Sequence, residues 1–157
     1  MLSLMDVYGS MLQSYGHKIT KQREAVLKVL LDNIDQHLKV EDIYEEIKKN
    51  GGSFGLATIY RAVTMLSEIG LVDKVILPDG ISRYKLVGTV SVDGHKKNVT
   101  RKYRMICRNC DKVTNLEIEE LNRYLNKVCK KIDMNVEDIE VNFYGICNDC
   151  SLGKENN

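Results

Sequence analysis

Apolar residues in the first half of the chain recur at helical spacing, in stretches separated by polar or glycine-containing breaks. This periodicity predicts an amphipathic helix over residues 3–14, a second helix capped by Thr20, a third over 40–49 and a fourth from about 56 to 69. The apolar faces of the last three helices are formed by Ala25, Val26, Val29 and Leu30, by Val40, Ile43, Tyr44 and Ile47, and by Ile59, Ala62, Val63, Leu66 and Ile69. A glycine follows each of the last two segments, where a helix stop is expected.

The next stretch, LVDKVILPDGISRYKL, changes to the pattern of two β-strands. Two runs rich in β-branched residues flank Pro78-Asp79-Gly80, which suits a tight turn. Three helices, the last two joined by a short turn and followed by a two-stranded hairpin, are the elements of a winged helix-turn-helix. We therefore predict a winged-helix DNA-binding domain over residues 1–86.

The second half of the chain alternates strands with a helix. Residues 87–102 lack helical periodicity, and we expect a loop or hinge between two domains there. Residues 103–152 contain strand-like runs and a predicted helix over 117–131, which we expect to pack against antiparallel strands. The whole chain is thus predicted to be α+β, with a small C-terminal domain and a tail over 153–157. A unit of fewer than about 60 residues has a marginal core, so a metal staple would suit it.

Composition and charge narrow the class of protein without identifying a ligand. Hydrophobic residues make up 43% and charged residues 29% of the chain, the balance of a globular protein. We find no signal peptide and no run near the roughly 20 apolar residues of a membrane helix, so we expect a cytoplasmic protein. The net charge is +1, and residues 1–86 carry 11 basic and 11 acidic side chains. DNA binding must therefore be argued from motif and placement, because bulk charge does not support it.

Four of the five cysteines form two C-x2-C knuckles, Cys107 with Cys110 and Cys147 with Cys150. In a reducing compartment this spacing indicates metal binding rather than disulfides. Two knuckles complete a tetrahedron around one Zn2+ per chain, and four thiolates leave no open position for catalysis, so we expect a structural zinc. Cysteines without metal, reduced or redox-active, are the alternative. Cys129 is either a partly buried apolar side chain or a thiol activated by neighbouring lysines.

The fourth predicted helix leaves polar side chains on its outer face. These are Thr58, Tyr60, Arg61 and Thr64. An α-helix fits the major groove of DNA, where Arg bonds guanine or phosphate and Tyr or Thr contacts thymine methyl groups. These residues are candidate DNA contacts, although an exposed Tyr-Arg pair can also be ordinary solvated surface.

Four segments, GHKITKQREAVLKVL, LATIYRAVTMLSEIGLV, ICRNCDKV and YGICNDC, resemble in order and spacing the ferric uptake regulator family of iron-, zinc- and peroxide-sensing repressors. The resemblance spans about residues 12–150. It implies a winged helix followed by an α+β dimerisation domain, and a homodimeric repressor on a palindromic operator. It also implies that Tyr60 and Arg61 contact bases and phosphate, that Lys18 reaches toward the minor groove, and that the knuckle cysteines hold a structural zinc.

The family's second metal site, which senses iron, manganese or zinc, is not matched. Of its ligand positions only His37 is retained. The other positions are occupied by Lys85, by Arg101-Lys102-Tyr103-Arg104, by Asn115 and by Ile139. Charged lysine and arginine side chains do not ligate a divalent cation beside like charges. We therefore expect that the sensing site is lost and that His37 is a surface histidine.

Three hypotheses for regulation stay open. The first is that basic side chains replace the missing cation in an ion-pair latch across the hinge, which salt would weaken. The second is that a basic cluster binds an anionic effector or DNA phosphate, unless it is simply a solvated charged loop. This cluster consists of Lys96, Lys97, Arg101, Lys102 and Arg104. The third is a relocated metal site built from Asp93, His95 and His37.

Other classes of protein have less support. The sequence contains no Gly-rich phosphate loop, no nucleophile motif and no paired carboxylates tied to a histidine, so we do not predict an enzyme. Two alternatives remain besides the regulator. One is a zinc-thiolate redox switch that controls dimer stability. The other is an interaction module that has lost DNA binding.

Overall fold

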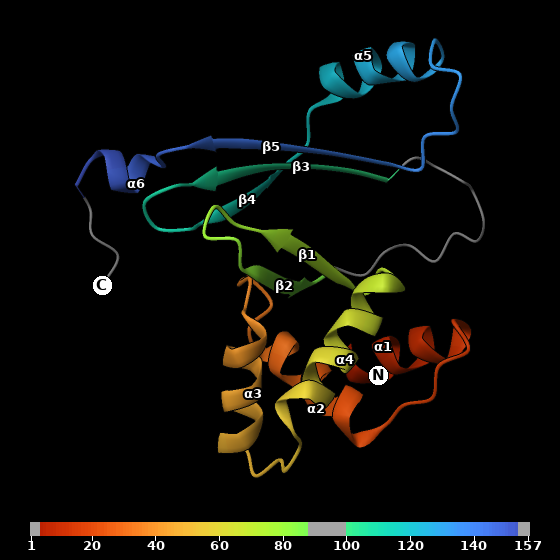
Figure 1. The fold of residues 1–157 in the computed structure, drawn as a ribbon, viewed down its shortest axis with the longest axis vertical. Coiled ribbons are helices and arrows are strands. Elements are labelled where there is room, and N and C mark those ends of the chain that lie inside the picture. The colour runs from red at the N-terminus through yellow and green to blue at the C-terminus, as the bar shows by residue number, and fades with distance from the viewer. Residues whose placement is uncertain (1–3, 88–99, 154–157) are drawn as a thin grey trace. The chain divides into compact units, whose positions relative to one another are not determined.

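The computed structural model describes residues 4–87 and 100–153 (Figure 1). The chain divides into two compact units, residues 1–90 and residues 91–157. Asp93, His95, Lys96 and Lys97, which enter two of the regulatory hypotheses, lie outside the described residues.

The N-terminal unit contains the predicted helices followed by the predicted hairpin. Its elements are α1 (Leu4–Ser14), α2 (Lys21–Asp32), α3 (Val40–Lys49), α4 (Leu56–Glu68), β1 (Val72–Ile76) and β2 (Ser82–Leu86). The N-cap of α2 is Thr20, whose hydroxyl accepts a hydrogen bond from the Arg23 N–H group. Helices α3 and α4 are each followed by a glycine with positive φ, Gly51 at 82° and Gly70 at 79°, a conformation that side chains disfavour.

One core holds the N-terminal unit together. Apolar side chains from all four helices and from both strands of the hairpin are buried in a single cluster. The predicted apolar face of α4 supplies Ile59, Ala62, Val63 and Leu66. Because that face is used for packing, the opposite face of α4 is left for solvent or a partner.

The β1–β2 hairpin is antiparallel and closed by a polar turn. The register pairs Val72 with Leu86 and Ile76 with Ser82. At the tip, the Asp79 carboxylate accepts hydrogen bonds from the Arg83 guanidinium and from the Ile81 N–H group, and these lower the pKa of Asp79 to about 2. These bonds stabilise the folded turn at neutral pH, and the contribution is lost as the pH falls from the ordinary Asp value toward about 2.

The segment between α2 and α3 is tied to the hairpin. Leu38 and Tyr84 exchange backbone hydrogen bonds of 2.8 Å in both directions. This bridge fixes the start of α3 against β2. On the other side of the unit, the Tyr8 hydroxyl of α1 donates to the carbonyl oxygen of Val87, 2.7 Å away, directly after β2.

The C-terminal unit is built on a mixed three-stranded sheet. Its elements are β3 (Thr100–Cys107), β4 (Val113–Leu116), α5 (Glu119–Cys129), β5 (Asp138–Gly145) and α6 (Asn148–Ser151), and the strand order is β4-β3-β5. Strand β3 occupies the last residues of the predicted loop over 87–102. The expectation of antiparallel strands is wrong for β5, which runs parallel to β3 with Cys107 opposite Gly145. The parallel direction brings the two knuckles to the same end of the sheet (Figure 1).

The core of this second unit is small. Among the residues of this unit that the structure describes, those buried are Tyr103, Arg104, Ile106 and Cys107, all on β3, and α5 has none. Side chains of α5 reach β3 through two hydrogen bonds, Asn122 accepting from Tyr103 and Asn126 accepting from Arg101. In neither described segment is a helix long and apolar enough to cross a lipid bilayer.

Replacing Leu66 by Ala tests the role of the α4 face in the N-terminal core. Leu66 is fully buried, and its truncation leaves a cavity that should lower the free energy of unfolding by about 2–5 kcal/mol. Urea denaturation followed by far-UV circular dichroism measures this loss. The control is Ile76→Ala at a position 55% exposed, which should change stability by about 0.5 kcal/mol or less. Equal effects from the two substitutions would contradict the packing described for α4.

Candidate metal centre and nucleic-acid interface

The four knuckle cysteines meet at the end of the β3–β5 pair. Cys107 ends β3, Cys110 lies in the turn toward β4, and Cys147 and Cys150 lie at the N-cap and within α6. Their sulfur atoms all lie within 4.8 Å of one another, with Cys107 3.9 Å from Cys150 and Cys110 3.8 Å from Cys147. The predicted convergence of the two knuckles is confirmed.

These sulfur separations fit a tetrahedral ion. A zinc ion bound by thiolates at about 2.3 Å places the sulfurs about 3.8 Å apart. Two of the separations match this value without rearrangement. Four soft sulfur ligands favour zinc over magnesium or calcium, which prefer oxygen.

The backbone around Cys107 stabilises a negative charge. The N–H groups of Cys147 and Asn109 point at its sulfur over 3.3 and 3.4 Å. Hydrogen bonds from the backbone of Cys147 and Cys110 are the main causes that lower the pKa of Cys107 to about 6. A hydrogen bond from Asn109 lowers the pKa of Cys150, but the Cys147 sulfur and burial outweigh it and raise that pKa to about 12. Binding of a cation by all four sulfurs as thiolates must therefore release protons from cysteines such as Cys150.

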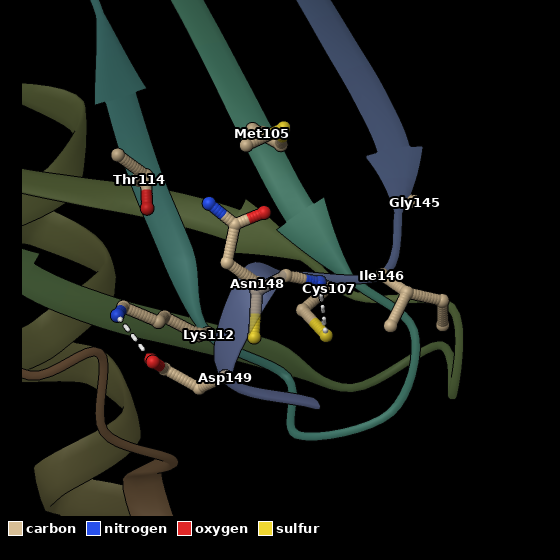
Figure 2. A pocket seen from close by; sticks show the side chains of 9 residues that line it. Met105, Cys107, Lys112, Thr114, Gly145, Ile146, Asn148 and Asp149 are labelled. Atoms are coloured by element: carbon tan, nitrogen blue, oxygen red, sulfur yellow. Dashed lines mark hydrogen bonds and ion pairs between the residues drawn. The ribbon is translucent and has the colours of Figure 1, made fainter. Parts of the chain in front are cut away.

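A cavity of about 300 Å3 adjoins the cluster. Its walls include Met105 and Thr114 of the sheet, and the start of α6. Figure 2 shows Cys107 beside this cavity and, at its edge, the ion pair of Lys112 with Asp149, whose charged atoms are 3.4 Å apart. That pair links the turn of the first knuckle to α6, so a polar contact supports the same junction as the four sulfurs.

The second candidate site lies on the outer face of α4. Tyr60, Arg61 and Thr64 are exposed there, and Thr58 is half-buried. The Arg61 guanidinium lies 3.5 Å from the Thr58 hydroxyl, at the N-terminal end of the helix. Lys18 is exposed before α2, and its carbonyl oxygen accepts a hydrogen bond from Arg23. These four side chains of α4, one positively charged and three with hydroxyl groups, suit contacts to phosphate and base edges.

One residue of this surface was missed by the sequence analysis. Glu41, in the first turn of α3, accepts a hydrogen bond of 2.7 Å from the hydroxyl of Tyr60. This bond lowers the pKa of Glu41 and raises the pKa of Tyr60. The partners are 19 residues apart. Helical periodicity places Glu41 on a polar face but does not say which neighbouring helix it reaches.

The expectation that His37 is a surface histidine is wrong. Its side chain is only 7% exposed, and Nε2 lies 3.6 Å from the carboxylate of Asp73 on β1. Asp73 stands opposite Lys85 in the hairpin register. The retained histidine thus has an acidic neighbour on the hairpin. The Leu38–Tyr84 bridge, one residue away, causes this burial by holding the segment against β2.

The interpretation of the basic cluster as a solvated loop is wrong for Arg101, Lys102 and Arg104. All three lie on β3, and the strand divides them between two faces of the sheet. Arg101 bonds Asn126 of α5. On the other face, Glu140 of β5 lies 4.0 Å from the ammonium of Lys102 and 3.7 Å from the guanidinium of Arg104, which is 1% exposed. Glu140, 36 or more positions along the chain, supplies the acid that the local sequence lacks.

The remaining candidate residues do not converge on a second metal site. Asn115 lies opposite Arg104 in the β3–β4 register, and Ile139 lies opposite Arg101 in the β3–β5 register. Cys129 is half-buried in α5, as its apolar interpretation expects. Within residues 4–87 and 100–153, the four knuckle cysteines form the only group of three or more possible ligands.

Comparison with known sequences agrees with this architecture. The sequence profile of the Ferric uptake regulator family matches residues 14–144. The Ferric uptake regulation protein of Bacillus subtilis (strain 168) is 35% identical over 144 residues, which cover 92% of this chain and 91% of that protein.

Two solved structures show the same fold. A zinc uptake regulator complexed with zinc and DNA aligns with a TM-score of 0.73 at 18% identity, covering 96% of this chain and 95% of that one. The Vibrio cholerae ferric uptake regulator aligns with a TM-score of 0.65 at 23% identity, covering 89% of this chain and 99% of that one. The predicted order of a winged helix followed by an α+β unit is confirmed.

Cobalt binding tests the four-sulfur centre. Apoprotein titrated with Co2+ should develop the strong thiolate-to-cobalt absorption of a tetrahedral four-sulfur site. Cys150→Ser should weaken this absorption, whereas Cys129→Ser, outside the cluster, should leave it unchanged. Because protonated cysteines must lose their protons to bind the metal, cobalt uptake should weaken as the pH falls. Unaltered absorption in Cys150→Ser would contradict the assignment.

Proposed function

This chain belongs to the ferric uptake regulator family and is a DNA-binding transcriptional regulator, and we propose that it acts as a homodimeric repressor on a palindromic operator. The observation that carries the proposal is the exposed outer face of α4, with its buried face fixed in the core of the winged-helix unit. Members of this family are regulators rather than enzymes.

The proposed DNA contacts come from α4 and from the segment before α2. Arg61 donates to guanine or phosphate, Tyr60 and the two threonines contact bases, and Lys18 reaches the backbone or minor groove. These side chains are exposed or half-exposed, which leaves them available to a ligand. Since net charge is close to zero, affinity must come from these few contacts rather than from a general positive field.

Homodimer formation is supported by the apolar surface of the C-terminal unit. Helix α5 has no buried residue although its apolar and polar positions are sharply segregated. The large side chains of the unit that remain exposed include Tyr124 at 65%, Met105 at 43% and Phe143 at 42%. A second copy of this unit would bury them and enlarge a small core, as expected for a dimerisation domain.

We further propose that the four cysteines hold one structural zinc per protomer and that regulation no longer depends on a metal. The retained His37 lies beside Asp73. Asp73 in turn stands opposite Lys85 in the hairpin register. In the C-terminal unit, the ligand positions of the family are taken by side chains that pair with Glu140 and Asn126. Such a donor set does not fit a divalent cation, whereas ion pairs can hold the same segments without one.

Substituting Arg61 by Ala tests the phosphate and base contacts of α4. Loss of one contacting cation should reduce the slope of log K against log salt by about 1 and weaken binding. Fluorescence anisotropy with a duplex selected from a random-sequence library measures both. The control, Lys28→Ala on the exposed face of α2, should leave the slope unchanged. If Tyr60→Ala/Arg61→Ala binds DNA as well as the wild type, α4 is not the recognition helix.

Elemental analysis tests the loss of metal sensing. Reduced protein is exposed to excess Mn2+, Fe2+ and Zn2+ and then desalted, and one zinc per protomer should remain because one four-sulfur site is present in the described residues. DNA affinity should be the same before and after this exposure. A second metal retained reproducibly, together with tighter DNA binding, would contradict metal-independent regulation and implicate His37.

A further inference from the structure

The hydrogen bond between Tyr60 and Glu41 lies on the surface assigned to DNA. It joins the fifth residue of α4 to the first turn of α3 over 2.7 Å, and Tyr60 remains 41% exposed. Both residues line an open groove of about 740 Å3 that also includes Lys39, Lys74 and Ser82. The pair therefore borders open space in the N-terminal unit rather than packed core, and a ligand can approach it.

The first turn of α3 contains two acids with different tasks. Asp42 accepts the backbone N–H of Lys39 and caps its own helix over 3.1 Å. Glu41 instead reaches across to α4. Asp42 thus caps the start of α3, whereas the Glu41 carboxylate bonds to a side chain of α4.

The hydrogen bond to Glu41 determines whether the Tyr60 hydroxyl donates or accepts a further hydrogen bond. A phenol has one proton to donate and lone pairs that accept. The Glu41 carboxylate accepts the hydrogen bond that the Tyr60 hydroxyl donates. This bond lowers the pKa of Glu41 and raises the pKa of Tyr60, so Glu41 is ionised and Tyr60 is neutral at neutral pH. Only the acceptor side of the hydroxyl is then directed to a ligand.

We propose that Glu41 is a positioning residue that fixes the Tyr60 hydroxyl as a hydrogen-bond acceptor toward the major groove. An acceptor is matched by the exocyclic amino group of adenine or cytosine and is repelled by the carbonyl oxygen of guanine or thymine. Phosphate oxygens are likewise acceptors, so the same arrangement directs Tyr60 to a base rather than to the backbone. This inference rests on the proposed DNA-binding function of α4.

The negative charge of Glu41 also affects the affinity for DNA. A carboxylate on a DNA-facing surface repels phosphate whatever the sequence, so it lowers non-specific affinity. A charge-assisted hydrogen bond is stronger than a neutral one and holds the hydroxyl in one orientation. Repulsion that lowers the affinity for every sequence leaves base preference unchanged, whereas the fixed acceptor increases the ratio of specific to non-specific binding.

The test compares base preferences of the full-length, metal-loaded protein and its variants. Each protein selects from the same random-sequence duplex library, and the enriched pools are sequenced. In each half-site of the wild type, one position should prefer adenine or cytosine on the contacted strand. Glu41→Ala and Tyr60→Phe should each reduce that preference severalfold, at most about tenfold, the size of one neutral hydrogen bond, with the other positions unchanged. Glu41→Ala should have no further effect in the Tyr60→Phe background.

Two controls separate this role from a general effect of charge or stability. Glu45, one turn further along α3, is also exposed, and Glu45→Ala removes the same charge without touching Tyr60. It should raise affinity for all sequences slightly and leave every base preference intact. Glu41→Gln keeps an acceptor for the Tyr60 proton and should retain part of the preference. Urea denaturation should show that every variant remains folded under the conditions of the selection.

The inference is wrong if the position that depends on Tyr60 prefers guanine or thymine. It is also wrong if Glu41→Ala leaves every base preference intact, or if Glu41→Ala weakens the base preference at all positions equally. If instead the wild type enriches no sequence at all, the proposed function itself fails and the inference falls with it. A wild type that selects a site while Glu41→Ala matches it refutes only the role of Glu41.

Discussion

The C-terminal unit depends on four sulfur atoms at one end of a parallel strand pair. Its own buried residues all come from β3, and α5 contributes none, so hydrophobic burial holds it together only weakly. The knuckles close a 43-residue separation between Cys107 and Cys150. A tetrahedral ion bound there, as proposed, would hold the ends of β3 and β5 together in their parallel direction. It would also stabilise the surface formed by α5 and the sheet.

The N-terminal unit, by contrast, is held together by its buried apolar core. Side chains of four helices and the hairpin share one core, and the Leu38–Tyr84 bridge joins the α2–α3 segment to β2. Helix α4 is thereby held on its apolar side, and the orientation of Tyr60 and Arg61 follows from packing rather than from a ligand. The retained histidine is part of this packing, since His37 is buried beside Asp73 of the hairpin.

The sequence predicted what depends on neighbours close along the chain. Helical periodicity placed α4 and its outer face, the Thr20 cap was recognisable from residue type, and the C-x2-C spacing identified the four cysteines that converge. The errors concern partners brought from elsewhere. Strand direction in β5, the burial of His37 and the pairing of Arg104 with Glu140 are set by strand register, which no local pattern encodes. Glu41 escaped notice for the same reason.

The N-terminal core and the C-terminal sulfur cluster form at different times during translation, because they lie at different positions along the chain. Every side chain of the N-terminal core lies between Tyr8 and Leu86, so this unit can fold while the ribosome is still translating the second half. The sulfur cluster is incomplete until Cys147 and Cys150 have left the exit tunnel, because neither knuckle alone offers four ligands. A nascent chain can therefore form the surface proposed to contact DNA before its sulfur cluster can bind a metal. If the cluster holds zinc as proposed, newly made chains in a zinc-starved cell would accumulate with an unfolded C-terminal unit, and cellular proteases would cleave that unit first.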